Sequence, residues 1–528
     1  MPRFALLLAV FVVVTACPAP ADSPPAARAG GEQLQGKWVG DDQAIAAFLG
    51  VPFAAPPVGD LRWRAPRAHA PRAGVRSATT FAPACMQTDY IVDWYVDIAK
   101  AFGRGEDVVE RPRGVSEDCL YLNVWTPALD GELPVMVWLH GGANQGGWSY
   151  EPNYIGTALA SRGVVVVSIA YRLGALGFFA HPQLGNEPDE AAANFGWLDQ
   201  LHALRWLHEN AGAFGGDPSN MTVFGESAGA GDLLNMIVAG PQRAPVRRFI
   251  AQSQATDIAA RASLADERRN GLRLADALGI ADDGNAMARL RDVSALEIVT
   301  TAESVLADHY YDVVLDGDTF AETPLDYVNR HAGDAVPAGI DLLAGSNADE
   351  WYMYLDATTA WSDVDAWLAR TLSGREAALR AALANITDPR RALDRLQTAY
   401  EMDCPLQRLA NRLAAGGGRA FVYRFDRVRE GAGGERLGSY HGAEIPYVFG
   451  THDIWLPTTP ADRELTAAMM DSWVSFARTG DPNTGSTPRW PVYDAGSQQV
   501  MRLGTTRHVA TADNALLCEL MAPGLANE

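Results

Sequence analysis

Residues 221–231 read MTVFGESAGAG, a short apolar run followed by a glycine-rich turn. The run at 221–224 has the length and composition of a strand that is buried on both faces. The pentapeptide GESAG at 225–229 follows directly and has the pattern G-x-S-x-G. Between a strand and a helix, such a turn strains the serine backbone and exposes its hydroxyl at the edge of a sheet. The stretch predicts that Ser227 is a nucleophile, although an ordinary glycine-rich turn has the same pattern.

Strands and helices alternate on both sides of this turn. Upstream, the apolar runs at 133–139 and 164–170 have the length of buried strands, and residues 196–213 carry leucines at helical spacing. Downstream, residues 340–345 and 420–425 indicate two further strands. This alternation predicts an α/β fold with a central, mostly parallel sheet flanked by helices.

Two long segments between the downstream strands have helical patterns. Residues 259–305 carry charged faces, and residues 357–404 are rich in Ala, Leu and Arg. Another helix is predicted at 464–478, and a short antiparallel hairpin at 36–50. With neither an internal repeat nor a domain-scale linker, residues 36–528 are predicted to form one α/β domain, with helical insertions over the active-site face.

The N-terminus has the features of an export signal. Arg3 precedes an apolar run at 4–14, which is too short to span a bilayer, and small residues follow it. Residues 1–21 are therefore predicted to be a signal peptide, and residues 22–35, rich in Pro, Ala and Gly, a flexible spacer. The mature protein is expected to be secreted, periplasmic or anchored to the outer membrane.

Cys17 admits two interpretations. It follows Val14-Thr15-Ala16, a stretch that resembles a bacterial lipoprotein box, in which the cysteine is lipidated and becomes the first mature residue. Alternatively, cleavage after Ala21 removes it. Both interpretations leave four of the five cysteines, enough for two disulfides in an oxidising compartment.

The charge balance excludes some partners. The chain has 64 acidic and 43 basic residues, a formal net charge of −21. A protein this acidic is not expected to bind nucleic acid or an anionic membrane surface. Membrane contact is therefore expected only through an N-terminal lipid anchor, and the sequence predicts no oligomeric state.

A second glycine-rich turn, HGGA at 140–143, follows the apolar run at 133–139. α/β-Hydrolases place oxyanion-binding N–H groups in such a turn upstream of the serine, and glycine lets the backbone approach the substrate closely. Ala228 opens the helix after Ser227, so its N–H is predicted to point toward the same oxyanion. We interpret His140 as a residue that holds the loop rather than as the catalytic base.

Several further stretches carry a family resemblance: FLGVPFA at 48–54, SEDCLYLNV at 116–124, YRLG at 171–174, NFG at 194–196, FGGDP at 214–218, FGESAGA at 224–230 and FARTG at 476–480. With these motifs the chain resembles the type-B carboxylesterase/cholinesterase family of α/β-hydrolases from about residue 36 to the C-terminus. The resemblance implies the α/β-hydrolase fold and a serine hydrolase that cleaves small-molecule carboxylic esters through an acyl-enzyme. It implies no metal and no organic cofactor, and the histidines show no H-E-x-x-H pairing.

The resemblance also assigns the partners of Ser227. The family's acid is a glutamate in an Asp-Glu pair, here Glu350, with Asp349 as the alternative. The base lies in a His-Gly-x-Glu segment, here His441 in HGAE at 441–444. The order Ser, Glu, His along the chain is that of α/β-hydrolases.

By resemblance, the oxyanion hole consists of the N–H groups of Gly142, Ala143 and Ala228. The family usually has glycine in place of Ala143 and an aromatic residue in place of Asn144. The methyl group of Ala143 is expected to narrow the space beside the acyl group, and Asn144 to make the wall more polar. Glu226 resembles an acidic neighbour that supports the imidazolium in this family; the alternative is a surface side chain.

The resemblance further implies two disulfides, Cys85 with Cys119 and Cys404 with Cys518. The first would close a loop that contains Trp94. This tryptophan, with Tyr90 and Tyr95 in a helix-like stretch, either walls the active site or serves in packing.

Two other functions use the same fold. One is a catalytically inactive binding or adhesion module, and the other is a peptidase or amidase with the same triad. Because all three triad positions are filled, we expect an esterase.

Overall fold

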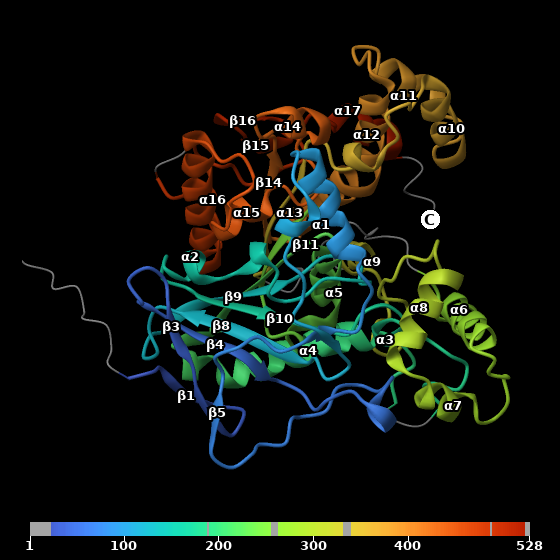
Figure 1. The fold of residues 1–528 in the computed structure, drawn as a ribbon. Coiled ribbons are helices and arrows are strands. Elements are labelled where there is room, and N and C mark those ends of the chain that lie inside the picture. Colours follow the sequence, from blue (N-terminus) through green and yellow to red (C-terminus); the bar gives the residue numbers. More distant parts are fainter. Residues whose placement is uncertain (1–22, 187–189, 255–261, 331–338, 486–487, 523–528) are drawn as a thin grey trace, which may run out of the picture.

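An eleven-stranded mixed sheet forms the centre of the computed structural model, which describes residues 23–186, 190–254, 262–330, 339–485 and 488–522 (Figure 1). The strand order is β16-β15-β14-β13-β12-β11-β9-β10-β8-β4-β3. Neighbours from β10 through β15 run parallel, and the pairs at both edges of the sheet are antiparallel. The strands are β3 (Lys37–Val39), β4 (Ile45–Pro52), β8 (Tyr121–Thr126), β9 (Leu133–Leu139), β10 (Val165–Ile169), β11 (Gly216–Glu226), β12 (Arg248–Gln252), β13 (Asp341–Asn347), β14 (Arg419–Phe425), β15 (Gln499–Leu503) and β16 (Arg507–Thr511). The predicted α/β fold, its strands and the hairpin at 36–50 are confirmed.

Helices cover both faces of the sheet, because successive side chains of each strand point to opposite sides. On β9, Val137 belongs to one buried cluster and Trp138 to another. The first cluster includes residues of α4 (Phe195–Asn210), α5 (Ala228–Arg243) and α13 (Cys404–Ala415). The second includes residues of α1 (Tyr90–Ala101), α2 (Thr157–Ala160), α15 (Ile445–Phe449) and α16 (Pro460–Thr479).

The two predicted helical segments are insertions that follow neighbouring parallel strands. After β12 come α6 (Leu264–Ala277), α7 (Ala286–Asp292), α8 (Ala295–Val305) and α9 (Pro324–Arg330); after β13 come α10 (Trp361–Thr371), α11 (Glu376–Ala382) and α12 (Pro389–Thr398). Two separate apolar clusters stabilise them. Both insertions leave the sheet at the carboxyl ends of their strands, which is also where β11 ends at the serine turn (Figure 1). Short helices α3 (Gly174–Gly177), α14 (Ala432–Leu437) and α17 (Ala515–Met521) complete the set.

The N-terminal segment corrects one prediction. Residues expected to form a flexible spacer contain two antiparallel strands, β1 (Ala26–Ala29) and β2 (Glu32–Gln35), and β2 also pairs with β5 (Val75–Ser77). Alternate apolar side chains from both strands, among them Ala29 and Leu34, pack into the core. Apolar residues alternate with polar ones in this segment, but the Pro- and Ala-rich composition obscured that pattern. The segment therefore forms strands and not a flexible spacer. The proposed signal peptide and Cys17 lie outside the described residues.

Both disulfides implied by the family resemblance are present. Cys85 at the end of β6 (Ala84–Cys85) is bonded to Cys119, near β7 (Val115–Ser116) and just before β8, and Cys404 of α13 is bonded to Cys518 of α17. Within the described ranges, no helix is both long enough and apolar enough to cross a bilayer.

Candidate active site

Ser227 lies at a strained turn between β11 and α5. Its backbone has φ 55° and ψ −124°, a conformation that L-residues rarely adopt. The flanking glycines are needed because the turn presses against β9: a Cβ on Gly229 would lie 2.4 Å from the carbonyl oxygen of Leu139, and one on Gly225 would lie 2.8 Å from the same oxygen. The glycines of the G-x-S-x-G pattern are therefore required for two reasons: a side chain at either position would clash with β9, and the backbone of the turn is strained.

The structure brings Ser227, His441 and Glu350 together from three distant segments. Nε2 of His441 lies 2.9 Å from Ser227 Oγ, and its Nδ1 lies 2.7 Å from Glu350 Oε2. Glu350 follows β13, and His441 lies in a turn between α14 and α15. Both distances are within hydrogen-bond range, so a proton can pass from the hydroxyl to the ring while the acid holds the other ring nitrogen.

A buried network holds Glu350 in place. Its Oε1 accepts a hydrogen bond of 2.6 Å from the backbone N–H of Asn347. The Asn347 amide donates to Glu444 Oε2 at 2.7 Å, and Gln252 donates to Glu444 Oε1 at 3.0 Å. Sequence reasoning did not identify Asn347, Gln252 or Glu444 as supporting residues, although Glu444 is the last residue of the motif that contains His441.

Asp349, the alternative acid, points elsewhere. One carboxylate oxygen accepts from the backbone N–H of Ser439 at 2.8 Å, and the other forms an ion pair of 3.0 Å with Arg391. These contacts occupy both oxygens, so the geometry favours Glu350 as the partner of His441.

Glu226 is a buried neighbour of His441 and not a surface side chain. It is 5% exposed, and its Oε1 lies 3.2 Å from His441 Nε2. Burial raises the pKa of Glu226 to about 8, although His441 partly opposes this shift. Burial disfavours the imidazolium of His441, but Glu226 and Glu350 outweigh this effect and raise its pKa to about 9. The site therefore stabilises a positive charge on the ring.

The turn after β9 supplies free N–H groups beside Ser227. Gly142 has φ 100° and Ala143 has φ 55°, and a Cβ on Gly142 would lie 2.3 Å from the carbonyl oxygen of Gly146. Among the described residues, the N–H groups of Gly142 and Ala143 have no hydrogen-bond acceptor. Ala228 is the first residue of α5, so its N–H also lacks an intrahelical partner. These are the three residues that the family resemblance places in the oxyanion hole.

His140 is a structural residue of this turn. It is buried, its Nδ1 lies 2.9 Å from the carbonyl oxygen of Gly141, and its ring stacks on Tyr171 with centroids 4.5 Å apart. Burial lowers the pKa of His140 to about 4, so the ring is neutral at physiological pH. The geometry agrees with its interpretation as a residue that holds the loop.

The prediction that Asn144 makes the cavity wall polar is wrong. Its side chain is completely buried and donates to Asp232 at 3.3 Å and to the carbonyl oxygen of Tyr311 at 3.2 Å. Because Asn144 has a positive φ of 53°, its side chain points in a different direction from that of a residue in an extended backbone. Its amide therefore fixes the turn against α5 instead of facing the substrate.

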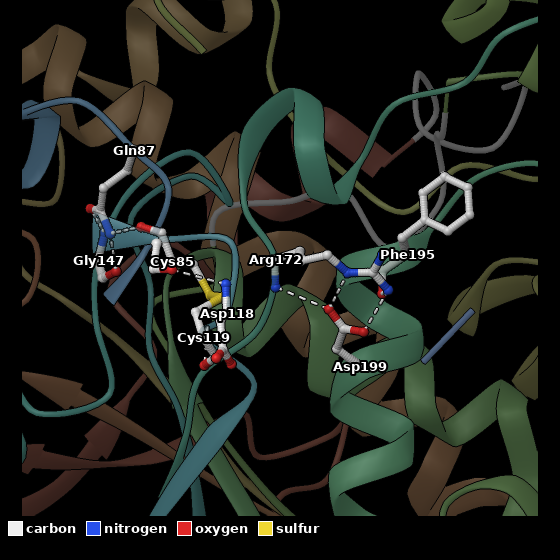
Figure 2. The surroundings of a disulfide bond; sticks show 9 residues. Cys85, Gln87, Asp118, Cys119, Gly147, Arg172, Phe195 and Asp199 are labelled. Carbon is white, nitrogen blue, oxygen red and sulfur yellow. Dashed lines mark hydrogen bonds and ion pairs between the residues drawn. A yellow bond between two sulfur atoms is a disulfide. The ribbon is translucent and has the colours of Figure 1, made fainter. Parts of the chain in front are cut away.

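A glutamine ties the same turn to the first disulfide (Figure 2). The Gln87 side chain donates to the carbonyl oxygens of Gly147 at 2.7 Å and Cys85 at 3.1 Å, and it accepts from the N–H of Gly147 at 2.8 Å. The buried ion pair of Arg172 with Asp199 lies close by in the same view. The sequence offered no signal for Gln87, because its role depends on a contact 60 residues away.

A cavity with a volume of about 260 Å³ opens at Ser227 and His441. Aromatic residues form much of its wall: Tyr90, Trp94, Tyr95, Tyr154, Tyr310, Trp351 and Tyr354. Nε1 of Trp94 donates to the Tyr354 hydroxyl at 2.9 Å, which links α1 to the segment after Glu350. The stretch containing Trp94 thus lines the active site, while Tyr310 and Tyr354 were missed because they come from unrelated parts of the chain.

Comparisons with known proteins agree with this geometry. A family model described as the carboxylesterase family matches residues 25–521. Fumonisin B1 esterase from Sphingopyxis macrogoltabida is 34% identical over 500 residues, covering 87% of this chain and 84% of that protein. Acetylcholinesterase from Bungarus fasciatus is 32% identical over 499 residues, covering 88% and 80%.

Solved structures are similar over nearly the whole chain. A thermophilic PNB esterase superposes with a TM-score of 0.79 at 27% identity, covering 94% of this chain and 100% of its own. A carboxylesterase from Geobacillus stearothermophilus gives a TM-score of 0.79 at 29% identity, covering 94% and 99%.

Proposed function

Because the chain belongs to the carboxylesterase family, we propose that it hydrolyses small-molecule carboxylic esters in two acyl-transfer steps, with Ser227 as the nucleophile. The observation that carries this proposal is the pair of contacts of His441, 2.9 Å to Ser227 Oγ and 2.7 Å to Glu350 Oε2. A nucleophile, a base within hydrogen-bond reach and an orienting acid are the parts that acyl transfer requires.

In the first step, Nε2 of His441 takes the proton of Ser227 Oγ, and the oxygen attacks the ester carbonyl carbon. The carbonyl oxygen becomes an oxyanion that accepts hydrogen bonds from the N–H groups of Gly142, Ala143 and Ala228. Each such donor contributes about 3 kcal/mol to transition-state stabilisation. When the tetrahedral intermediate collapses, His441 gives its proton to the leaving alcohol, and the acyl group stays on Ser227.

In the second step, water replaces the alcohol. His441 removes a proton from the water, which attacks the acyl carbon, and the same oxyanion-binding groups hold the second tetrahedral intermediate. Returning the proton to Ser227 Oγ releases the carboxylic acid. Glu350 keeps the proton of the neutral ring on Nδ1, and both Glu350 and Glu226 stabilise the imidazolium that forms in each step.

A hydrolase assay separates this proposal from its two alternatives. The purified protein is expected to hydrolyse p-nitrophenyl butyrate much faster than the corresponding p-nitroanilide. A folded preparation that cleaves neither substrate would point to the inactive binding module, and one that prefers the anilide would point to an amidase.

We further propose that the protein is exported, and that it is secreted, periplasmic or attached to the outer membrane through a lipid on Cys17. Two disulfides support an oxidising compartment. Mass spectrometry of the mature N-terminus tests this: a diacylglyceryl-modified Cys17 or a terminus after Ala21 is expected, and an intact leader on the mature protein would contradict export.

Family membership does not identify the ester that this protein hydrolyses. The two similar sequences carry names that refer to different esters, fumonisin B1 in one case and acetylcholine in the other. The alcohol and acyl preferences of this chain must therefore come from its own cavity.

A further inference from the structure

The oxyanion turn, residues 140–147, contains two consecutive residues that carry a side chain and have a positive φ. Ala143 has φ 55° and Asn144 has φ 53°. L-residues other than Asn and Asp rarely adopt this conformation, because Cβ then lies too close to the following carbonyl oxygen. It persists only where the surrounding structure holds it. The contacts that keep Ala143 in this conformation must therefore come from its neighbours in the turn.

Asn144 supplies three such contacts. Its side chain is completely buried, whereas Ala143 lines the active-site cavity. The backbone carbonyl oxygen of Asn144 accepts a hydrogen bond of 2.6 Å from the N–H of Gly174, the first residue of α3. The side-chain amide donates to Asp232 Oδ1 at 3.3 Å and to the carbonyl oxygen of Tyr311 at 3.2 Å. One residue thus ties the oxyanion turn to three other segments of the chain.

Asp232 links this anchor to the helix that carries the other proposed oxyanion donor. It lies on α5 four residues after Ala228, so the two residues are neighbours on one face of the helix. Asp232 is completely buried, and its Oδ2 accepts a hydrogen bond of 2.6 Å from the Gln200 side chain of α4. The hydrogen bond from Asn144 to Asp232 therefore joins the oxyanion turn to the helix that begins at Ala228.

We propose that Asn144 is a positioning residue, which keeps the oxyanion hole formed before substrate arrives through its hydrogen bond to Asp232. This role rests on the proposed esterase function, because it concerns the donors of that same site. Donors that are fixed before the reaction stabilise an oxyanion better than donors that must first reorient. The role is specific to this chain, since the family that it resembles usually has an aromatic residue at this position, and an aromatic side chain cannot make both hydrogen bonds of the amide.

The variant Asn144→Ala removes the amide and leaves the backbone. Ala143 is then expected to relax toward negative φ, and its N–H to turn away from the oxyanion. We expect kcat/KM for p-nitrophenyl butyrate to fall about 100-fold, as for the loss of one oxyanion donor. The acid limb of the kcat/KM profile should stay at the same pH, because the printed contacts of Asn144 do not include His441 or its carboxylates.

Two inhibitors that differ at one carbon separate a loss of oxyanion binding from a general loss of structure. Ser227 Oγ adds to the carbonyl carbon of trifluoromethyl butyl ketone; the π electrons of the C=O bond become the oxyanion, and the serine proton moves to His441. The corresponding secondary alcohol has the same carbon chain and cannot form this adduct. In N144A the Ki of the ketone is therefore expected to rise about 100-fold, and that of the alcohol to change less than about 2-fold.

Asn194→Ala is the matched control. Asn194 is also buried with a positive φ, 63°, and its amide donates to the carbonyl oxygen of Val314 at 3.0 Å and to Asp316 Oδ2 at 3.1 Å. These are the same kinds of hydrogen bond, made by a residue outside the oxyanion turn. We expect the Tm to fall in both variants, and the Ki of the ketone to stay within about 2-fold of wild type in N194A. Equal increases of this Ki in N194A and N144A would overturn the proposal.

Asp232 tests the same hydrogen bond from its other end. Asp232→Asn keeps an oxygen that can accept from Asn144, and Gln200 can turn its Oε1, which has no partner among the described residues, toward the new NH₂ group. Asp232→Ala removes the acceptor. The Ki of the ketone is expected to rise no more than about 3-fold in D232N and about 10-fold in D232A. An unchanged Ki in D232A, or equal losses in both variants, would overturn the proposal. If N144A does not fold, D232A decides the same question.

The wild-type protein distinguishes this role from the esterase function itself. Turnover of p-nitrophenyl butyrate by wild type, together with an unchanged Ki of the ketone in N144A, refutes the role of Asn144 alone. An acid limb that shifts in N144A would mean that Asn144 acts through His441, and would also refute that role. Absence of both turnover and ketone binding in wild type refutes the esterase function, and the role of Asn144 with it.

Discussion

The two sides of His441 differ in backbone strain and in hydrogen bonding. On the acid side, Glu350 accepts a short hydrogen bond from the N–H of Asn347. On the nucleophile side, Ser227 has φ 55°, and Oε1 of Glu226 accepts no hydrogen bond from the described residues and meets only His441 at 3.2 Å. The carboxylate of Glu350 is fixed by a hydrogen-bond network, and that of Glu226 is held mainly by burial.

The acid side orients the ring of His441, whereas the reaction takes place on the nucleophile side. Both carboxylate oxygens of Glu350 are hydrogen-bonded before substrate arrives, so the acid side can hold the ring of His441 in one position throughout the cycle. The nucleophile side keeps strain and incompletely paired polar atoms at the place where charge develops. Substitutions on the two sides should therefore lower the catalytic rate by different factors and change different kinetic properties.

The largest effect is expected from Ser227→Ala, which removes the reacting oxygen and leaves the turn intact. The value of kcat is expected to fall by at least about 10⁴-fold, as for the nucleophile of other serine hydrolases. A fluorophosphonate probe should no longer label the protein, and its Tm should change little. Labelling that persists in the variant would refute Ser227 as the nucleophile.

Glu350→Gln tests the acid side. Glutamine can present its NH₂ group to Nδ1 of His441 and so favour the wrong ring tautomer, which is expected to lower kcat by about 10³-fold. Asp349→Asn is the matched control, because Asp349 contacts Ser439 and Arg391 instead of His441. A larger loss in D349N than in E350Q would reverse the assignment of the acid.

Gly229→Ala tests the strained turn itself. The added Cβ would lie 2.4 Å from the carbonyl oxygen of Leu139, so the turn must move away from β9. We expect kcat to fall by about 100-fold and the free energy of unfolding by about 2 kcal/mol, the usual range for overpacking. Gly212→Ala, where a Cβ would meet no atom within 4 Å, is the control and should leave both quantities unchanged.

The smallest effect is expected from Glu226→Gln, at about 10-fold in kcat/KM, since Glu350 still stabilises the imidazolium. The informative measurement is the pH profile. Because Glu226 raises the pKa of His441, and the neutral ring is the active base, its loss should move the acid limb of the kcat/KM profile to lower pH. An acid limb that stays in place would show that Glu226 does not act through His441.

The sequence predicted the serine turn and most strands because both depend on neighbouring residues. The apolar run at 133–139 coincides with β9, and the run at 164–170 contains β10. The helical pattern at 196–213 contains most of α4. The segment at 26–35 was missed, since its apolar residues are small and sparse, and its strands depend on pairing with each other and with β5.

Residues that act across long distances in sequence were harder to predict. Glu350 is one of 64 acidic residues, and only the family resemblance selected it. Asn144 was assigned to the wrong side of its turn, because its direction depends on a positive φ that composition does not reveal. Glu151 was not considered, since its place at the cavity depends on Tyr95 and Trp148.

By itself, the sequence determined the reaction centre: a strand, a strained glycine-flanked serine and a second glycine-rich turn follow from local sterics and periodicity. The family motifs then added the acid, the base and the disulfide pairs. Only the tertiary structure decided which carboxylates surround His441 and which charges line the cavity. The reason is physical, because hydrogen bonding and burial are set by groups that meet only when the chain has folded.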